Sequence, residues 1–302
     1  MRSVYLTFVC IAVITTSLFC GQALAVEEVM IYKLWGGLEG RHAYQVELFK
    51  LAMQKTEMDY PAYTLTYYNQ RLGSLRGRRE IARGELINVY IAPPRPADGP
   101  LESQIISIPV PLLKGLLGYR KLIVRTKDIQ LFEKIENDEQ LKAFQVGQAR
   151  GWPDVEVYRH NGYPIIDSGA FGDLFLMLEQ KRFDYLPLGI MEVERALSSY
   201  SAKSDSLSIL SNIYIYYPHP AIFHLSAKQP RLAERLEAGL RLSMEDGSMD
   251  RLFASHFATY LKELSERTGP LIVLGNPNLD SDMGLSEPLL SPGSNIHGNS
   301  IH

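Results

Sequence analysis

The feature that most constrains the fold is an apolar stretch in the middle of the chain, "IPVPLLKGLLGYRKLIV" at residues 108–124. Its prolines and glycines argue against one continuous helix. It also falls short of the roughly 18 apolar residues that indicate a membrane-spanning helix. We interpret it as a segment that leaves one hydrophobic core, bends, and enters a second core. The alternative is one large sheet with an internal strand at residues 119–124.

Strands and helices are predicted to alternate before this stretch. Residues 28–35, 63–69 and 86–94 are rich in β-branched and aromatic side chains, which is typical of strands. Residues 42–56 have the apolar spacing of a helix, and residues 71–85 are a basic helix candidate. The order β-α-β-α-β with short connections predicts a parallel sheet covered by helices.

The alternation resumes after residue 114. The predicted elements are strands at residues 121–125, 163–168 and 183–190, a strand, glycine turn and helix within residues 139–162, and a helix at residues 170–182. A long aromatic run at residues 211–226 then predicts extended chain. Helices follow at residues 230–245 and after residue 247, with Ser248 as the expected N-cap.

These patterns predict an α/β fold of two lobes joined by two crossing segments. Lobe one comprises residues 26–113 and 217–268, and lobe two comprises residues 114–216. The outward crossing lies within residues 108–124 and the return within residues 212–224, and their glycines and prolines mark the bends of a hinge. Residues 269–302 are rich in Gly, Pro, Ser and Asn, which predicts an irregular tail.

The first 25 residues have the pattern of a secretory signal. A positive Arg2 precedes an apolar run, and Ala23-Leu24-Ala25 is a cleavage site with small residues. We expect cleavage after Ala25 and a periplasmic mature protein. A retained membrane anchor is one alternative, and a lipoprotein attached through Cys20 is another, although the bulky Phe19 precedes that cysteine.

Composition excludes several classes of function. Both cysteines, Cys10 and Cys20, lie in the expected signal, so the mature chain has no disulfide, thiol nucleophile or Cys-ligated zinc. The weakly acidic charge of -3 gives no reason to expect nucleic acid as a partner. The sequence has no Gly-x-Ser-x-Gly, P-loop or His-Glu-x-x-His motif. We therefore expect neither an enzyme, nor a cofactor, nor a metal site.

Five segments, in this order, resemble type II periplasmic solute-binding proteins of the family 3 or amino-acid-binding kind. They are "LINVYIA", "IISIPVPLLKGLLGYRKLIV", "LKAFQVGQARGWPD", "LMLEQKRFDYLPLG" and "LAERLEAGLRLSMEDGSMDRLF", which lie within residues 86–253 of a resemblance that covers about residues 28–264. The resemblance implies a two-lobed fold of the periplasmic binding protein-like II type. It also implies a monomer that binds a small solute and delivers it to an inner-membrane permease of the ABC type.

The sequence departs from this family where an α-amino acid would be held. Family members place an arginine before the outward crossing to clamp the carboxylate, but "ADGPLESQIIS" contains none. They place an aspartate shortly after the strand that ends near residue 188, where this chain has Leu188 and Gly189. Glu192 is the nearest acidic residue, out of register. An amino-acid ligand therefore does not follow from the resemblance.

Ligands of open α/β lobes sit beyond the carboxyl ends of the strands, which selects candidates in lobe one and at the crossing. Trp35 and Gly36 would face the cleft from lobe one, unless Trp35 belongs to the core. Arg95 lies at a strand end beside prolines, as a ligand contact or a solvated side chain. Tyr119 and Arg120 follow the bend, where Arg120 either faces the cleft or makes a salt bridge between the lobes.

Lobe two contributes the segment "GQARGWPD" at residues 147–154. Arg150 supplies positive charge and Trp152 a stacking face, although an ordinary capped turn with a packed tryptophan is the alternative. Glu192 is either a ligand contact or a helix-start residue. The arginines at positions 71, 76, 78, 79 and 83 are predicted to form one solvated helix face, with docking to an inner-membrane partner as the alternative.

The sequence thus favours a periplasmic, non-enzymatic protein that closes on a small solute. Arg150 or Arg120 would hold a carboxylate or other anion, and Trp35, Trp152 and Tyr119 would supply contact area. The second hypothesis is a binding module that serves a sensor rather than a transporter. The third is an exported enzyme built on a two-lobed fold.

Overall fold

The computed structural model describes residues 29–35, 41–70, 72, 74–94, 99, 101–201, 205–279, 283–285 and 287–289. The expected signal at residues 1–25 lies outside them, as do two candidate ligand contacts, Gly36 and Arg95. Within the described part of the chain, no helix is both long and apolar enough to cross a membrane.

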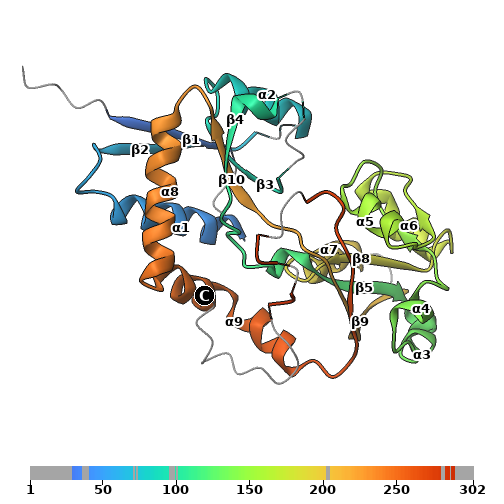
Figure 1. The fold of residues 1–302 in the computed structure, drawn as a ribbon. Coiled ribbons are helices and arrows are strands. Elements are labelled where there is room, and N and C mark those ends of the chain that lie inside the picture. The colour runs from blue at the N-terminus through green and yellow to red at the C-terminus, as the bar shows by residue number, and fades with distance from the viewer. Residues whose placement is uncertain are drawn as a thin grey trace, which may run out of the picture.

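Lobe one is built on a five-stranded sheet in the order β2-β1-β3-β10-β4 (Figure 1). Its strands are β1 (Met30–Trp35), β2 (Tyr63–Tyr68), β3 (Val89–Ala92), β4 (Ile105–Ile108) and β10 (Ile222–Ser226). Strand β1 runs parallel to β2 and β3, and β10 runs antiparallel to β3 and β4. The parallel β-α-β-α-β unit predicted for this lobe is confirmed, with β10 and β4 added at one side.

Four helices pack on this lobe: α1 (Arg41–Lys55), α2 (Ser74–Arg83), α8 (Pro230–Glu245) and α9 (Ser248–Glu266). Helices α1 and α8 approach closely, because a Cβ at Gly239 would lie 2.1 Å from the carbonyl oxygen of Ala52. Ser248 is not the N-cap of α9. Gly247 takes that position with φ 72°, a left-handed conformation that glycine adopts without strain.

Lobe two is built on a six-stranded sheet in the order β11-β9-β5-β8-β6-β7. The strands are β5 (Tyr119–Arg125), β6 (Val146–Gly147), β7 (Ile165–Ile166), β8 (Tyr185–Gly189), β9 (Leu207–Tyr216) and β11 (Leu271–Val273). The helices are α3 (Ile129–Phe132), α4 (Asp138–Leu141), α5 (Asp154–His160), α6 (Phe171–Glu179) and α7 (Val193–Ser201). Short 3-10 helices occur at Glu102–Gln104, Leu116–Gly118 and Thr126–Asp128.

Strand β11 is a departure from the sequence prediction, which placed an irregular tail from residue 269 onward. Residues Leu271–Val273 pair in parallel with Tyr214–Tyr216 of β9. Central strand β5 is buried along its whole length, with Leu122 and Val124 in one core cluster and Ile123 in another. Both faces of this sheet are therefore covered, as expected for a sheet that has helices on each side.

Two crossing segments join the lobes, which confirms two lobes over a single sheet. The outward crossing, residues 109–118, connects β4 to β5, and the return crossing, residues 217–221, connects β9 to β10. They touch each other, because a Cβ at Gly118 would lie 2.2 Å from the carbonyl oxygen of Tyr217. Leu112 also donates a backbone hydrogen bond of 2.9 Å to Ala221.

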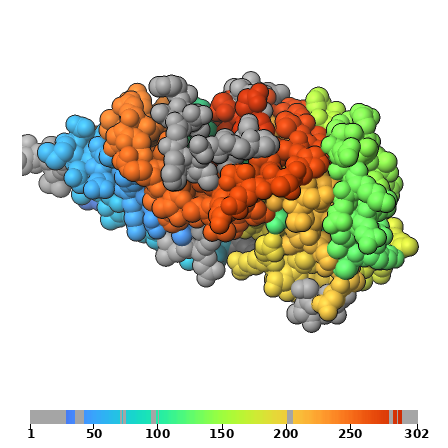
Figure 2. All heavy atoms as spheres, turned by 90° about the horizontal axis from the view of Figure 1, so that it is seen from below, coloured from blue at the N-terminus to red at the C-terminus, as the bar shows by residue number. Residues whose placement is uncertain are grey.

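Helix α9 spans both lobes, although the sequence assigned it to lobe one alone. Phe253 and Phe257 pack on Tyr44 of α1, whereas Glu263 forms an ion pair of 2.8 Å with Lys121 of β5. The helix is kinked at Phe257, whose φ and ψ are not helical. Seen from below, α9 and the residues after it lie between the blue end of lobe one and the yellow-green lobe two (Figure 2).

Candidate ligand-binding cleft

A cavity of about 630 Å³ lies between the two lobes. Its walls are formed in lobe one by Arg78, Tyr90, Ala92, Pro93 and Pro94, in lobe two by Gly151, Trp152, Pro153, Val155, Glu156, Arg159 and Asp167, and near the C-terminus by Asn278. It lies at the carboxyl end of β3 and at the start of α5. This is the location that the strand order predicts for a ligand.

The wall in lobe one is an aromatic surface. Tyr90 lines the cavity, and the Trp35 ring stacks on it with 4.8 Å between ring centroids and 25° between planes. Trp35 is fixed in turn by α2, because a Cβ at Gly77 would lie 2.3 Å from the indole ring. Its Nε1 donates to the carbonyl of Gln70. Trp35 therefore supports the cavity wall from behind Tyr90, and does not line it.

Below Tyr90, buried polar side chains fix the carboxyl end of the sheet. His224 is fully buried, and its Nε2 lies 3.2 Å from the carbonyl oxygen of Ala92 while its Nδ1 lies 2.8 Å from the Ser107 hydroxyl. Burial, and then the charge of Arg78, lower the pKa of His224 to about 4. The ring is thus neutral near pH 7, with Nε2–H donating to Ala92 and Nδ1 accepting from Ser107.

The wall in lobe two combines an aromatic face with paired charges. Trp152 is half-buried and contacts Phe171 of α6, with 5.7 Å between ring centroids. Arg159 forms ion pairs with Glu156 at 3.0 Å and Asp167 at 2.9 Å. One guanidinium therefore serves two carboxylates on this wall.

Arg78 is the other cation that lines the cavity, and it is also paired. Its side chain is 3% exposed and forms an ion pair with Glu102. The sequence predicted one solvated face of arginines on α2. Arg76, Arg79 and Arg83 are exposed as predicted, but Arg78 is buried, which corrects the prediction at this position. Arg71 lies outside the described residues. Each arginine among the described cavity-lining residues thus already has an acidic partner.

Arg150 is the expected cation that stays exposed. It lies in the turn between β6 and α5, where its backbone N–H donates to the carbonyl of Gly169 at 3.2 Å. Gly151 follows with φ 78° and lines the cavity. In the described part of the chain, the Arg150 side chain forms no ion pair. It is therefore placed at the edge of the cavity, without lining it.

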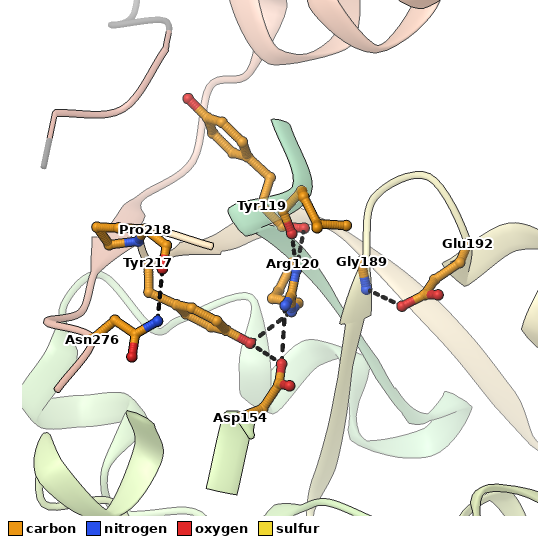
Figure 3. A network of polar contacts seen from close by, with 9 residues as sticks. Tyr119, Arg120, Asp154, Gly189, Glu192, Tyr217, Pro218 and Asn276 are labelled. Atoms are coloured by element: carbon orange, nitrogen blue, oxygen red, sulfur yellow. Dashed lines mark hydrogen bonds and ion pairs between the residues drawn. The ribbon is translucent and has the colours of Figure 1, made fainter. Parts of the chain in front are cut away.

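Arg120 lies in a buried network at the hinge, and does not face the cleft (Figure 3). Its guanidinium donates to Asp154 of α5 at 2.9 Å, and its Nε donates to the Tyr217 hydroxyl at 2.7 Å. It also donates to the carbonyl of Leu117. Arg120 thus ties both crossings to α5, so neither interpretation from the sequence, a cleft contact or a salt bridge between lobes, describes its place.

This network keeps Asp154 ionised. Burial would raise the pKa of this carboxyl group, but Arg120 and His219 outweigh that effect and bring it to about 2. The Tyr217 hydroxyl also donates to Asp154. The arrangement is a buried ion pair with its hydrogen bonds satisfied, which gives the base of lobe two a fixed geometry.

Two further candidates lie away from the cavity. Tyr119 is fully buried, and its ring lies 4.8 Å from that of Tyr216 in the core beside the crossings. Glu192 accepts a hydrogen bond of 3.1 Å from the backbone N–H of Gly189, at the turn before α7 (Figure 3). Its contact is that of a helix-start residue.

Of the candidates named from the sequence, Trp152 lines the cavity, and Trp35 and Arg150 lie beside it. Tyr90, Arg159, Asp167 and Asn278 also line the cavity and were not among those candidates. Tyr90 lies in the middle of the strand predicted at residues 86–94, so its position gave no sign that it borders the ligand side of the sheet. Among the described residues, no group of three or more His, Cys, Asp or Glu could hold a metal ion.

No protein-family model matches the chain, and no curated protein sequence matches it significantly. Similar solved structures include an ancestral arginine-binding protein bound to arginine, with a TM-score of 0.47, 14% identity, and coverage of 75% of this chain and 98% of that chain. An arginine transport periplasmic binding protein from Legionella pneumophila gives a TM-score of 0.48 and 13% identity, with coverage of 76% and 100%. The GluR0 ligand-binding core from Nostoc punctiforme, in complex with L-glutamate, gives 0.44 and 13%, with coverage of 76% and 99%.

Two further similar structures are substrate-binding proteins of amino acid ABC transporters, one of them from Streptococcus pneumoniae and bound to L-arginine. The described part of the chain has two α/β lobes joined by two crossing segments.

Proposed function

We propose that this protein binds a small solute in the cavity between its lobes and closes on it by rotation about the two crossings. The observation that supports this most directly is the cavity of about 630 Å³ with walls from both lobes. That volume lies within the roughly 300–1,000 Å³ typical of small-molecule sites. A ligand that touches both walls favours the closed arrangement, which is the physical basis of hinge closure.

Recognition in this proposal depends on the aromatic and proline surfaces of the cavity. Tyr90 and Trp152 contribute one aromatic face from each lobe, and Pro93, Pro94 and Pro153 add rigid apolar surface. Such surfaces bind planar or apolar parts of a ligand at little cost in side-chain entropy. The solute would therefore have an apolar or planar body, with polar groups at its ends.

The anionic character expected of the solute rests on Arg150 in this proposal. Arg78 and Arg159 line the cavity but are paired with Glu102, and with Glu156 and Asp167. Arg150 is exposed beside the cavity edge and is free to turn toward a bound carboxylate when the lobes close. Amino acids, which several structural neighbours bind, belong among the ligands to be tested.

The proposed setting is the periplasm, where the protein would act as a monomer without catalysis and hand its solute to an inner-membrane permease. The resemblance in sequence supports this setting, as do the neighbours from ABC transporters. The exposed arginines of α2, Arg76, Arg79 and Arg83, give such a partner a positively charged face to contact.

A thermal-shift screen of residues 26–302 tests the proposal, with amino acids, organic acids, small peptides and sugars as the probes. A ligand present at 100 times its dissociation constant adds roughly 2.7 kcal/mol to the free energy of unfolding, which raises the melting temperature. We expect at least one such ligand, and a screen without any would contradict the proposal.

The anion hypothesis is tested on the ligand that the screen identifies. We expect Arg150→Ala to weaken binding by tenfold or more, about 1.4 kcal/mol. The matched control is Arg182→Ala, which removes another exposed arginine of lobe two, outside the cavity lining. Equal affinities in the two variants would show that Arg150 does not hold the ligand.

A further inference from the structure

The segment that follows β11 contacts lobe two and both crossings. It leaves the sheet of lobe two at Leu274, which is buried in the core of that lobe and donates a backbone hydrogen bond of 2.8 Å to Tyr216. Farther along, Leu285 is 4% exposed and lies against the outward crossing, 3.4 Å from the Cβ position of Gly115. Leu289 packs on a core cluster that contains residues of lobe one, of the outward crossing and of lobe two. The described parts of this segment therefore contact lobe two and the crossings between the lobes.

Side-chain amides fix the start of this segment. Asn161, at the end of α5, accepts from the backbone N–H of Gly275 at 3.0 Å and donates to its carbonyl at 2.8 Å. Asn276 donates from Nδ2 to the carbonyl of Pro218 in the return crossing at 2.8 Å (Figure 3). Its Oδ1 accepts from the backbone N–H of Asn278 at 3.0 Å. Asn276 thus joins the segment to the hinge itself.

A second hydrogen bond holds the far end. The Tyr216 hydroxyl, at the end of β9, donates to the carbonyl of Leu285 at 2.7 Å. Between these two attachments, Asn278 lines the cavity. The segment is therefore part of the cleft wall, and Figure 1 shows its red ribbon between the lobes.

We propose that residues 274–279 and 283–285 form a strap that limits how far the two lobes open, with Asn276 as its positioning residue. Opening by rotation about residues 109–118 and 217–221 moves Pro218 and Gly115 relative to the strap. It therefore strains the bond from Asn276 to Pro218 and the contact of Gly115 with Leu285, which Tyr216 holds in place. The strap would thus hold the ligand-free cleft at a defined width. This inference rests on the proposed function for the role of the cleft, but its test needs no ligand.

The experiment is a distance measurement between two spin labels in the ligand-free protein, residues 26–302. This part of the chain has no cysteine of its own, so labels attach only at Arg241→Cys on α8 and Lys134→Cys in lobe two, both at exposed positions. The informative variant is Asn276→Asp. The aspartate still accepts a hydrogen bond from the backbone N–H of Asn278, but it has no N–H group to donate to the carbonyl of Pro218.

We expect Asn276→Asp to increase the population of longer distances by roughly fivefold, the effect of losing one hydrogen bond of ordinary net strength. Tyr216→Phe removes only the hydroxyl at the other end and should produce the same shift, which keeps the test valid if the first variant folds poorly. Asn278→Asp is the matched control, with the same charge change on the same segment and no bond to the hinge. Its distances should equal those of the parent.

Unchanged distances in both Asn276→Asp and Tyr216→Phe would overturn the strap, as would an equal shift in Asn278→Asp. These outcomes are distinct from failure of the proposed function, which would appear as a screen without ligands while the distance distributions still respond to the two variants.

Discussion

At the scale of single residues, buried ionisable groups of this protein are held by hydrogen bonds, ion pairs and aromatic rings. Arg120 has Asp154 and two oxygens of the crossings, and Arg235 is surrounded by carbonyl oxygens and the rings of Tyr60 and Tyr63. His224 is the buried group in this set whose charge changes in an accessible pH range. It therefore gives the residue-scale prediction.

Burial and the charge of Arg78 lower the pKa of His224 to about 4 in the folded protein. In the unfolded chain this pKa is near 6.5, so between about pH 6.5 and pH 4 the unfolded chain binds a proton that the folded protein does not bind. The stability that His224 contributes is present above about pH 6.5 and is lost as the pH falls toward 4. The expected loss is roughly 3 kcal/mol. Urea unfolding at pH 7 and pH 4.5 measures it.

His224→Gln is the control for this prediction, because glutamine donates and accepts but does not titrate. We expect the variant to lose less stability than the parent over the same pH interval. An identical loss in both proteins would show that other groups cause the acid sensitivity.

Residue chemistry also explains why the surroundings of Arg78 and Arg120 were not predicted from the sequence. Arg78 stands in a basic segment typical of a solvated helix face, and Arg120 stands in an apolar stretch that does not indicate its partner. Their burial comes from Glu102 and Asp154, which are 24 and 34 positions away. The pairing of distant residues depends on how the strands are ordered, and local sequence carries no record of it.

At the scale of elements, local signals were sufficient for the long helices. Helix α8 begins at Pro230 and ends at Glu245, as predicted from the proline at its first position and its leucine spacing. Strand β11 has three residues in a stretch rich in breakers, and it exists because β9 offers a free edge. Short strands of this kind are set by pairing with distant residues, so local propensity did not indicate β11.

The element-scale prediction concerns the contact of α1 with α8. Replacing Gly239 by alanine places a methyl group 2.1 Å from the carbonyl oxygen of Ala52, so the two helices must separate. We expect a loss of about 1–3 kcal/mol in the free energy of unfolding, as for other overpacked cores. Denaturant unfolding measures it.

Gly172→Ala in α6 is the matched control, since nothing lies within 4 Å of its Cβ position. Alanine there should stabilise the helix by about 0.5–1 kcal/mol, or leave it unchanged. If both substitutions had the same effect, the close approach of α1 and α8 would not be the cause.

At the scale of the whole molecule, the apolar stretch at residues 108–124 was the decisive signal. It contains the outward crossing and all but the last residue of β5, and a chain that leaves one core for another needs such a segment. The sequence predicted where the cleft lies, but not which residues line it. Its lining depends on how close the lobes stand, and Asn278 reaches it from a segment whose sequence indicated irregular structure.

The central claim is that the ligand lies between the lobes and touches both. The most direct test is one titration of the ligand found by screening, carried out on the parent and on Tyr90→Ala, Trp152→Ala and Tyr260→Ala. Tyr90 and Trp152 line opposite walls, whereas Tyr260 lies on α9 and does not line the cavity. We predict that the first two substitutions each weaken binding by about tenfold or more, and that the third leaves it unchanged. Full affinity in either Tyr90→Ala or Trp152→Ala would contradict the central claim.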